Sequence, residues 1–167
     1  MSYGIGKVQG SIPCLIRLAE PSEAGALTEI AWVSKRHWGY PDDSMARWRA
    51  ALEITPAYIG RIPVFAAEHR GALAALCAVV KLDARWDLDH LWVRPEHIGH
   101  GIGRLLFGHA VSHVRAKAAG ITLGIESDPK AEGFYVRMGA RRVGTIVRDW
   151  KGLRRELPYL EYRVPAN

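Results

Sequence analysis

The chain has 167 residues, of which 49% are hydrophobic and 24% are charged. Both proportions are ordinary for a soluble globular protein, and the length suits one domain with its own core. No apolar run approaches the ~18 residues that a membrane helix needs, and the first residues lack the charged start and long apolar core of a signal peptide. We therefore expect a cytoplasmic protein that has no membrane partner.

The formal net charge of +6 favours an acidic partner, either nucleic acid or a polyphosphate cofactor. The basic residues form no long run, because their densest clusters are the pairs Arg141-Arg142 and Arg154-Arg155. This distribution disfavours nucleic-acid binding. The two cysteines, Cys14 and Cys77, lie in apolar stretches, and we expect them to be reduced core residues.

The first part of the chain predicts an arm, a strand and a helix. Residues 1–12 are small, polar and rich in glycine, so we expect a loose arm ahead of a single domain over residues 13–167. A short strand is predicted at 14–19. The next helix is predicted to start at Pro21, which the first turn of a helix tolerates, and to stop at Gly39. Its inward face is predicted to carry Leu27, Ile30, Ala31, Ser34 and Trp38.

A second helix is predicted with Ser44 as its N-cap and with Met45, Trp48 and Leu52 facing inward. Beyond this helix the hydrophobic period changes to that of strands. Two β-rich runs flank His69-Arg70-Gly71, which is the form of a hairpin. A third run, over 85–93, leads directly into a group of glycines.

The sequence of the second half of the chain predicts two helices and three further strands. The first helix is predicted from Gly103 to about Ala119, before Gly120. Asp128 and Pro129 suit an N-cap and a first helical residue, so a short helix is predicted to run to Met138. The strands are predicted at 121–127, 140–147 and 157–164. The whole order predicts one α/β domain, with a mixed twisted sheet of about seven strands, about four helices and a parallel βαβ unit in the middle.

Three glycines, Gly99, Gly101 and Gly103, separate a predicted strand from a predicted helix. The free N–H groups and the dipole at a helix N-terminus attract anions, and glycine lets a diphosphate approach the backbone. A P-loop would need Gly-Lys-Ser/Thr, which Gly103-Arg104-Leu105 does not provide. A dinucleotide-binding turn would need G-x-G-x-x-G near the start of a βαβ series, which is not the spacing or the context found here.

The segment around these glycines, LWVRPEHIGHGIGRLL, resembles the cofactor motif of the GCN5-related N-acetyltransferase (GNAT) superfamily. That motif runs Val-x-Pro, four residues and Gly-x-Gly-x-Gly/Ala, and it is matched here by Val93, Pro95, Gly99, Gly101 and Gly103. A later segment, ESDPKAEGFYVRMGARRVG, resembles the superfamily's Asn-x-x-Ala-x-x-Phe-Tyr stretch, with matches at Asp128, Ala131, Phe134, Tyr135 and Gly139. The predicted order of elements also agrees over nearly the whole chain.

The resemblance implies acetyl-CoA as cosubstrate, with its pantetheine arm between two splayed parallel central strands. The strand residues that would pair with the arm, and one of whose amides would polarise the thioester carbonyl, are Leu91, Trp92 and Val93. The amides that would hold the pyrophosphate belong to Gly99, His100, Gly101, Ile102, Gly103 and Arg104. Two positions depart from the family pattern: Ile98 replaces the usual Arg or Gln, and Asp128 replaces the usual Asn. Asp128 is interpreted either as a helix cap or as a group that orders the arm through water.

The resemblance also implies catalytic roles. Tyr135 occupies the position of the acid that protonates the leaving thiolate, for which a phenol is a suitable donor. For the base that deprotonates the amine, Asp87 is favoured by its position, and His90 by the ordinary pKa of histidine. Strict alternation predicts that Asp87 and Asp89 share one face of the strand and that His90 lies on the other. Gly124 marks either a bulge or a place where a ligand approaches the backbone.

His109 and His113 have the spacing of metal ligands, but no third ligand is evident, so we expect no metal. The predicted function is transfer of acetyl from acetyl-CoA to an amine by direct attack in a ternary complex. The alternative is a non-catalytic module that binds or senses acyl-CoA on the same fold. The acceptor stays open among small amines, antibiotics, amino acids, peptide N-termini and protein lysines. Homodimers are frequent among similar domains, and the closing strands are the candidate contact.

Overall fold

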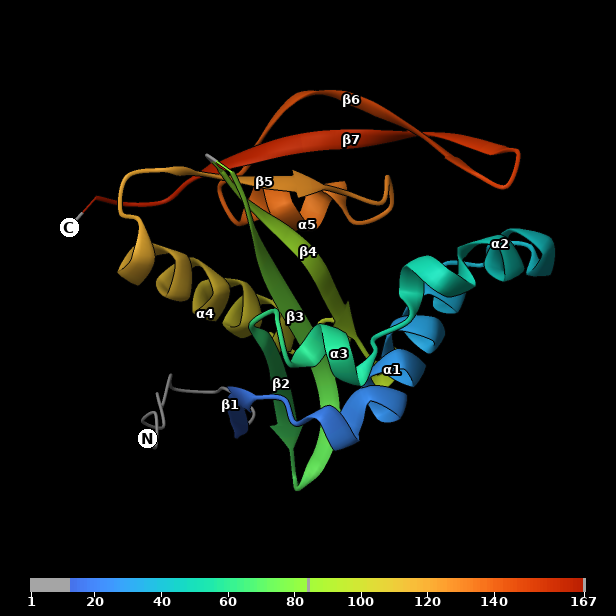
Figure 1. Ribbon diagram of the computed structural model, residues 1–167, viewed down its shortest axis with the longest axis horizontal. Coiled ribbons are helices and arrows are strands. Elements are labelled where there is room, and N and C mark those ends of the chain that lie inside the picture. Colours follow the sequence, from blue (N-terminus) through green and yellow to red (C-terminus); the bar gives the residue numbers. More distant parts are fainter. Residues whose placement is uncertain (1–12, 84, 167) are drawn as a thin grey trace.

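The computed structural model describes residues 13–83 and 85–166, so the predicted arm at 1–12 lies outside the described residues. One sheet of seven strands forms the centre of the molecule (Figure 1). Every neighbouring pair is antiparallel except β4 and β5, which are parallel. The strands, in their order across the sheet, are β1 (Cys14–Leu18), β2 (Val64–His69), β3 (Ala72–Leu82), β4 (Arg85–Val93), β5 (Thr122–Glu126), β7 (Leu153–Arg163) and β6 (Arg141–Trp150). The predicted fold class is confirmed.

Helices cover both faces of the sheet (Figure 1). One face packs against α4 and α5, with Leu106, Val114 and Tyr135 in a cluster that also contains side chains of β2 to β5. The other face packs against α1 and α3 through a second cluster, which includes Leu27 and Ile59. The helices are α1 (Ala24–His37), α2 (Asp42–Leu52), α3 (Pro56–Ile59), α4 (Ile102–Lys117) and α5 (Glu132–Arg137), with single 3-10 turns η1 (Pro21–Glu23) and η2 (Pro95–His97).

Three helix predictions need correction. Ser44 is not an N-cap, because α2 begins at Asp42 after the extended residue Pro41. Asp128 is not the N-cap of α5, which begins four residues later at Glu132. The short helix α3 is additional to the four predicted helices, although its signals are present in the sequence. Thr55 accepts a hydrogen bond from the Tyr58 N–H at 3.0 Å, and proline follows at the first helical position.

A bulge in β4 reverses the expected alternation of its side chains. His90 pairs with Ala78 and Leu88 pairs with Val79, which leaves Asp89 as an extra residue between them. Trp86 and Leu88 therefore face the α4 side before the bulge, and Leu91 and Val93 face it afterwards. Asp87 and His90 lie together on the opposite face. The prediction that His90 lies opposite Asp87 is wrong because it assumed an unbroken strand.

The parallel pair β4–β5 is short. Trp86, Asp87 and Leu88 pair with Leu123, Gly124 and Ile125, and pairing between the two strands then stops within the described residues. The remainder of β4, from Asp89 to Val93, pairs with β3 on one side only. Its other edge is therefore available to a ligand that can hydrogen-bond like a strand.

Gly108 offers a test of the helix that follows the glycine turn. It is an exposed residue inside α4, and a Cβ there would meet nothing within 4 Å. Because glycine loses more backbone entropy on folding than alanine does, Gly108→Ala should raise the free energy of unfolding by about 0.5–1 kcal/mol. Urea denaturation measures this change. An unchanged or lower value would contradict the helical environment assigned to this position.

Candidate active site

A cleft of about 510 Å³ opens between the free edge of β4, the glycine turn and α5. Most of the predicted cofactor residues line it, namely Leu91, Trp92, Val93, Gly99, Gly101, Gly103, Arg104 and Asp128. The side chains of the other two lie elsewhere. His100 is exposed outside this lining, and Ile102 is fully buried in the core under α4. Ile98, at the departure from the family pattern, also lines the cleft and is 38% exposed.

The three glycines of the turn have two different reasons to be glycine. Gly99 and Gly101 adopt φ angles of 84° and 87°, in the left-handed region that other residues enter only with strain. Gly101 is also the N-cap of α4. Gly103 has ordinary helical geometry, but a Cβ there would lie 3.4 Å from the Phe134 ring and 3.6 Å from the Val93 side chain. The turn thus places the N-terminus of α4 at the cleft and leaves its backbone uncovered.

A second cavity, of about 860 Å³, lies on the opposite face of the sheet, where α1, α2, β6 and β7 contribute its lining. The two cavities share Leu88, Asp89, Trp92, Glu126 and Asp128 as lining residues. They therefore meet where β4 and β5 part. A long ligand entering along the glycine turn and a second ligand entering from the α2 side can approach each other through this gap.

Asp87 lies in the second cavity, across from Gly124 of β5. Its Oδ2 accepts a hydrogen bond from Arg85 at 3.1 Å, whereas its Oδ1 is buried and has no hydrogen-bond partner among the described residues. Burial raises the pKa of this carboxyl, and Asp89 and Glu126 act in the same direction, while Arg85 opposes them. A carboxylate with a raised pKa and one free oxygen is suited to accept a proton.

Gly124 provides the space for this carboxylate. A Cβ at Gly124 would collide with Asp87 Oδ1 and would lie 2.5 Å from the Tyr159 hydroxyl. The pairing of β5 with β4 and β7 continues without a register shift at this residue, so Gly124 is not a bulge. The groups that approach Gly124 are side chains of the protein, and the predicted approach of a ligand to this residue stays a prediction. The sequence analysis did not identify Tyr159 as part of the site. The available signal was Gly124 itself, because a glycine inside a strand indicates that other groups lie close to the backbone there.

His90 is engaged at both ring nitrogens. Its Nδ1 accepts the indole N–H of Trp92 at 3.0 Å, so a neutral ring carries its hydrogen on Nε2, which lies 3.7 Å from Asp89 Oδ2. Burial lowers the pKa of His90, against the opposing charge of Asp89. A neutral His90 in this arrangement has no free lone pair, which makes it a poorer proton acceptor than Asp87. Asp89 in turn accepts a hydrogen bond from the Tyr58 hydroxyl.

Tyr135 extends from α5 into the cofactor side of the site. It lines the first cleft, is 7% exposed, and packs against the rings of Phe134 and Phe107 at centroid distances of 5.1 and 6.1 Å. No hydrogen bond to its hydroxyl is found among the described residues. Burial raises the pKa of this phenol, with further contributions from Cys77 and Asp128. The hydroxyl therefore holds its proton throughout the neutral range.

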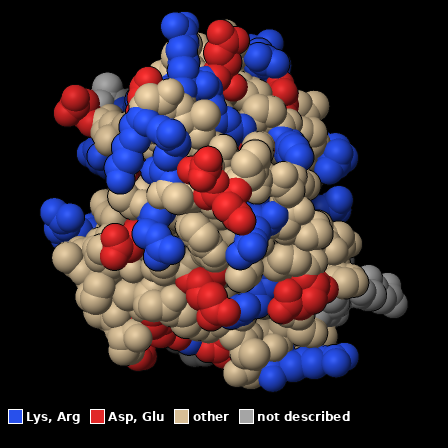
Figure 2. Space-filling view, turned by 90° about the vertical axis from the view of Figure 1, so that its right-hand side faces the viewer, with Lys and Arg blue, Asp and Glu red and all other residues tan. Residues whose placement is uncertain are grey.

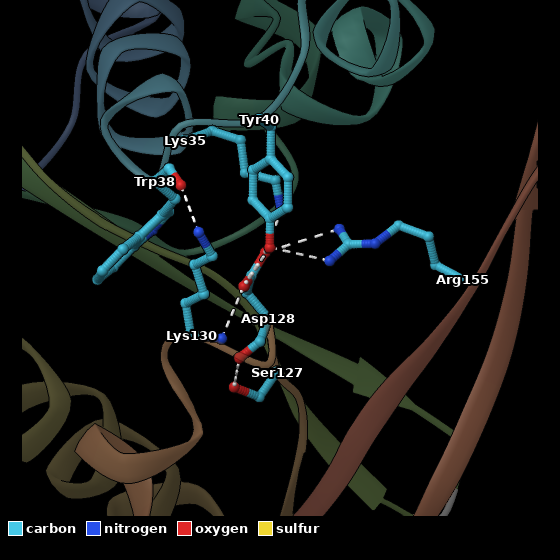
Figure 3. A network of polar contacts seen from close by, with 7 residues as sticks. All are labelled: Lys35, Trp38, Tyr40, Ser127, Asp128, Lys130 and Arg155. Carbon is cyan, nitrogen blue, oxygen red and sulfur yellow. Dashed lines mark hydrogen bonds and ion pairs between the residues drawn. The ribbon is translucent and has the colours of Figure 1, made fainter.

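Asp128 is the centre of a buried polar network that joins α1, β7 and the end of β5 (Figure 3). Its carboxylate pairs with Lys35 and accepts the Tyr40 hydroxyl at 2.8 Å and the Lys130 N–H at 2.9 Å. Arg155 donates to the Tyr40 hydroxyl at 2.9 Å and lies 3.7 Å from the carboxylate. Burial raises the pKa of Asp128, but Lys35 and these hydrogen bonds outweigh burial and leave the pKa below its ordinary value. Burial lowers the pKa of Lys35.

Lys35 and Arg155 were also missed by sequence reasoning. Lys35 follows Leu27 and Ala31 at four-residue spacing, so it falls on the buried face of α1, and this was an available signal. Arg155 belongs to no motif. It reaches Asp128 only because β7 lies beside β5 in the sheet.

The two histidines that have the spacing of metal ligands pack against an aromatic ring. His109 and His113 stack edge-on against Phe65 at 4.5 and 5.2 Å. No group of three or more His, Cys, Asp or Glu residues that could hold a metal is found within residues 13–83 and 85–166. In the same part of the chain, no helix is long and apolar enough to cross a membrane.

The Asp128 network gives a stability test. Asp128→Asn removes the only carboxylate that contacts the buried Lys35 among the described residues, so the free energy of unfolding should fall by about 3–5 kcal/mol. Because the folded-state pKa of Asp128 is lowered, its stabilising effect is present above the ordinary Asp pKa and is lost as pH falls through the folded-state value. The variant should therefore lose less stability on acidification than the parent. Denaturation at several pH values measures both effects, and Asp43→Asn, at an exposed residue, is the control. If the two variants lost the same free energy of unfolding relative to the parent, the stabilising role of Asp128 would be refuted.

Comparison with known proteins agrees with this geometry. Residues 60–139 match the family model of the acetyltransferase (GNAT) domain. An uncharacterized protein of Dictyostelium discoideum is 27% identical over 81 residues, which are 47% of this chain and only 18% of that protein's length.

Two solved structures resemble nearly the whole chain. A GCN5-related N-acetyltransferase from Rhodopseudomonas palustris has a TM-score of 0.77 at 18% identity, over 95% of this chain and 99% of the other. The PaiA N-acetyltransferase from Thermoplasma acidophilum, in complex with coenzyme A, has a TM-score of 0.71 at 19% identity, over 90% and 98% of the two chains. At these identities the likeness establishes the fold. The family match over residues 60–139, which is just under half of the chain, agrees with that fold, which is the fold of the GCN5-related N-acetyltransferases.

Proposed function

We propose that the protein is an acetyl-CoA-dependent N-acetyltransferase in which an amine attacks the acetyl group directly within a ternary complex. The observation that carries the proposal is the meeting of two cavities at the gap between β4 and β5. Asp87 lies on one side of this gap and Tyr135 on the other. A transfer between two bound molecules needs such an arrangement, whereas a simple binding module needs only the first cleft.

The residues of the first cleft fit coenzyme A. The uncovered backbone at Gly99 and Gly101 and the N-terminus of α4 suit a pyrophosphate, and Arg104 supplies positive charge beside them. The free edge of β4 suits the amide-containing pantetheine arm, and its main-chain N–H groups can polarise a carbonyl. When bound, acetyl-CoA supplies the acetyl group as a thioester. The Thermoplasma acidophilum relative with coenzyme A supports this choice of ligand.

Proton movements are assigned to two side chains. Asp87 Oδ1 is the free acceptor in the second cavity and takes the proton of the acceptor amine. The Tyr135 hydroxyl lies in the first cleft, stays protonated at neutral pH, and donates a proton to the departing sulfur. We assign the base to Asp87 rather than to His90, because the Trp92 indole occupies the lone pair of His90.

Ile98 favours one alternative, a module that binds acyl-CoA without catalysis. Its apolar side chain lines the first cleft where the family pattern has Arg or Gln, and it cannot contact a phosphate. Nucleic acid is a poorer candidate. Figure 2 shows acidic and basic side chains interspersed on the face that it presents, without a continuous basic surface.

Tyr135→Phe tests the assignment of the acid. The variant should lower kcat for thiol release from acetyl-CoA by about 10²–10⁴-fold, because it removes a general acid and little volume. Binding of acetyl-CoA, followed by thermal shift, should not change. The control is Tyr162→Phe, since Tyr162 packs against Phe107 in the same core but lines neither cavity. Acetyl-CoA binding without turnover on any amine would instead establish the non-catalytic module.

Asp87→Asn tests the assignment of the base through pH dependence. Because burial raises the pKa of Asp87, kcat/KM should increase with pH through a value above the ordinary Asp range, as the carboxylate forms. Asp87→Asn should lower kcat/KM strongly and abolish this acid limb. Asp83→Asn, on the exposed turn before β4, is the control. An acid limb that survives in Asp87→Asn would assign it to another group.

A further inference from the structure

Positive charge is in excess at the α1 end of the second cavity. Three cations, Lys35, Lys130 and Arg155, lie 4.9, 5.1 and 4.8 Å from the centre of the Tyr40 ring. Asp128 is the one carboxylate that pairs with them among the described residues, and the Lys130 ammonium donates only to the carbonyl of Trp38. The cluster keeps a surplus of two positive charges. Lys35 and Arg155 line the second cavity, whereas Lys130 lines the first cleft.

A buried donor without a partner lies at the same end. Within residues 13–83 and 85–166 no acceptor is found for the Trp48 Nε1–H, although this residue is only 3% exposed, and Trp48 lines the cavity. Leaving such a group unpaired costs about 1–3 kcal/mol. The side chains of Lys35 and Arg155 lie 4.6 and 4.7 Å from the Trp48 ring. Two cations and an unpaired N–H are the groups that recognise an anionic oxygen.

The other end of the cavity has the opposite character. Asp87 Oδ1 is a buried acceptor without a partner, whereas Asp89 is paired with Tyr58 and Glu126 with Arg148. The Tyr159 hydroxyl lies beside Asp87 over Gly124. Tyr159 and Arg155 are four residues apart on the same face of β7, a separation of about 13 Å along a strand. The cavity thus has a carboxylate with one unpaired oxygen near one end and cations in excess near the other.

We propose that the acceptor is an amine carrying a carboxylate several bonds away from its nitrogen. The carboxylate binds Arg155 and Lys35 beside Trp48, and the amine reaches Asp87. The placement of the amine rests on the proposed acetyltransferase function, because the amine must lie next to Asp87, the proposed general base. An amine and a carboxylate attached to the same carbon, as in glycine, cannot reach both ends of the cavity.

A matched pair of probes tests this recognition without turnover. Binding of 6-aminohexanoate and of hexylamine is measured by calorimetry with the protein saturated with coenzyme A, and glycine is the short control. The parent protein should bind 6-aminohexanoate about tenfold or more tightly than hexylamine, because only the former carries an anion. Equal affinities, or binding of neither probe, would overturn the proposal.

Two variants locate the effect. Arg155→Gln should remove most of the preference for 6-aminohexanoate, and Arg155→Lys should retain part of it. Arg154→Gln makes the same change of charge at the neighbouring exposed residue, on the other face of β7, and should retain the preference. Thermal denaturation checks that each variant is folded. If Arg155→Gln weakened binding of coenzyme A instead and left the preference unchanged, the cations would serve the cofactor and the proposal would fail.

Turnover of the same probes with acetyl-CoA separates the two proposals. Selective binding of 6-aminohexanoate without acetylation would support carboxylate recognition and refute the enzymatic function. Acetylation of both probes with equal KM would support the enzyme and refute carboxylate recognition.

Discussion

β4 and β5 are parallel neighbours for three paired residues only, and the site depends on their separation beyond that point. A longer parallel pair would close the free edge of β4 and separate the two cavities with a continuous sheet. The bulge at Asp89 lies where the strands part, and it brings Asp87 and His90 to the same face. The glycine turn then leads the chain from the end of β4 into α4, so that a helix N-terminus faces the same opening.

Local patterns were sufficient to place the seven strands along the chain, the hairpin at Arg70-Gly71 and the glycine turn, because each is determined by neighbouring residues. The bulge at Asp89 was beyond such reasoning, since a bulge is defined by which residues pair across two strands. Asp128 shows the same limit. Its Asp-Pro sequence favours a helix cap, but the charge of Lys35, 93 residues away, holds the carboxylate in the network instead. The role of Tyr159 likewise depends on a sheet neighbour that no motif announces.

Gly124, inside β5, and Asp128, two residues after the end of β5, shape the site in opposite ways. Gly124 contributes by having no side chain, and the space that it leaves is filled by Asp87 and Tyr159 from the two flanking strands. Asp128 contributes a charge that reduces, but does not cancel, the repulsion among the surrounding cations. In the proposed mechanism, Gly124 fixes the position of the base Asp87, and Asp128 sets the net positive charge that the proposed acceptor carboxylate would meet.

The polar network around Tyr40 also has a mechanical consequence. Lys35 and Tyr40 belong to the part of the chain that precedes β2, whereas Asp128, Lys130 and Arg155 belong to the part that follows α4. On the α1 face these contacts bridge the two half-sheets that the parting of β4 and β5 leaves otherwise weakly joined. The charges that hold the halves together are therefore the same charges that a bound anion would neutralise, so cohesion of the domain and occupancy of the cavity are thermodynamically linked.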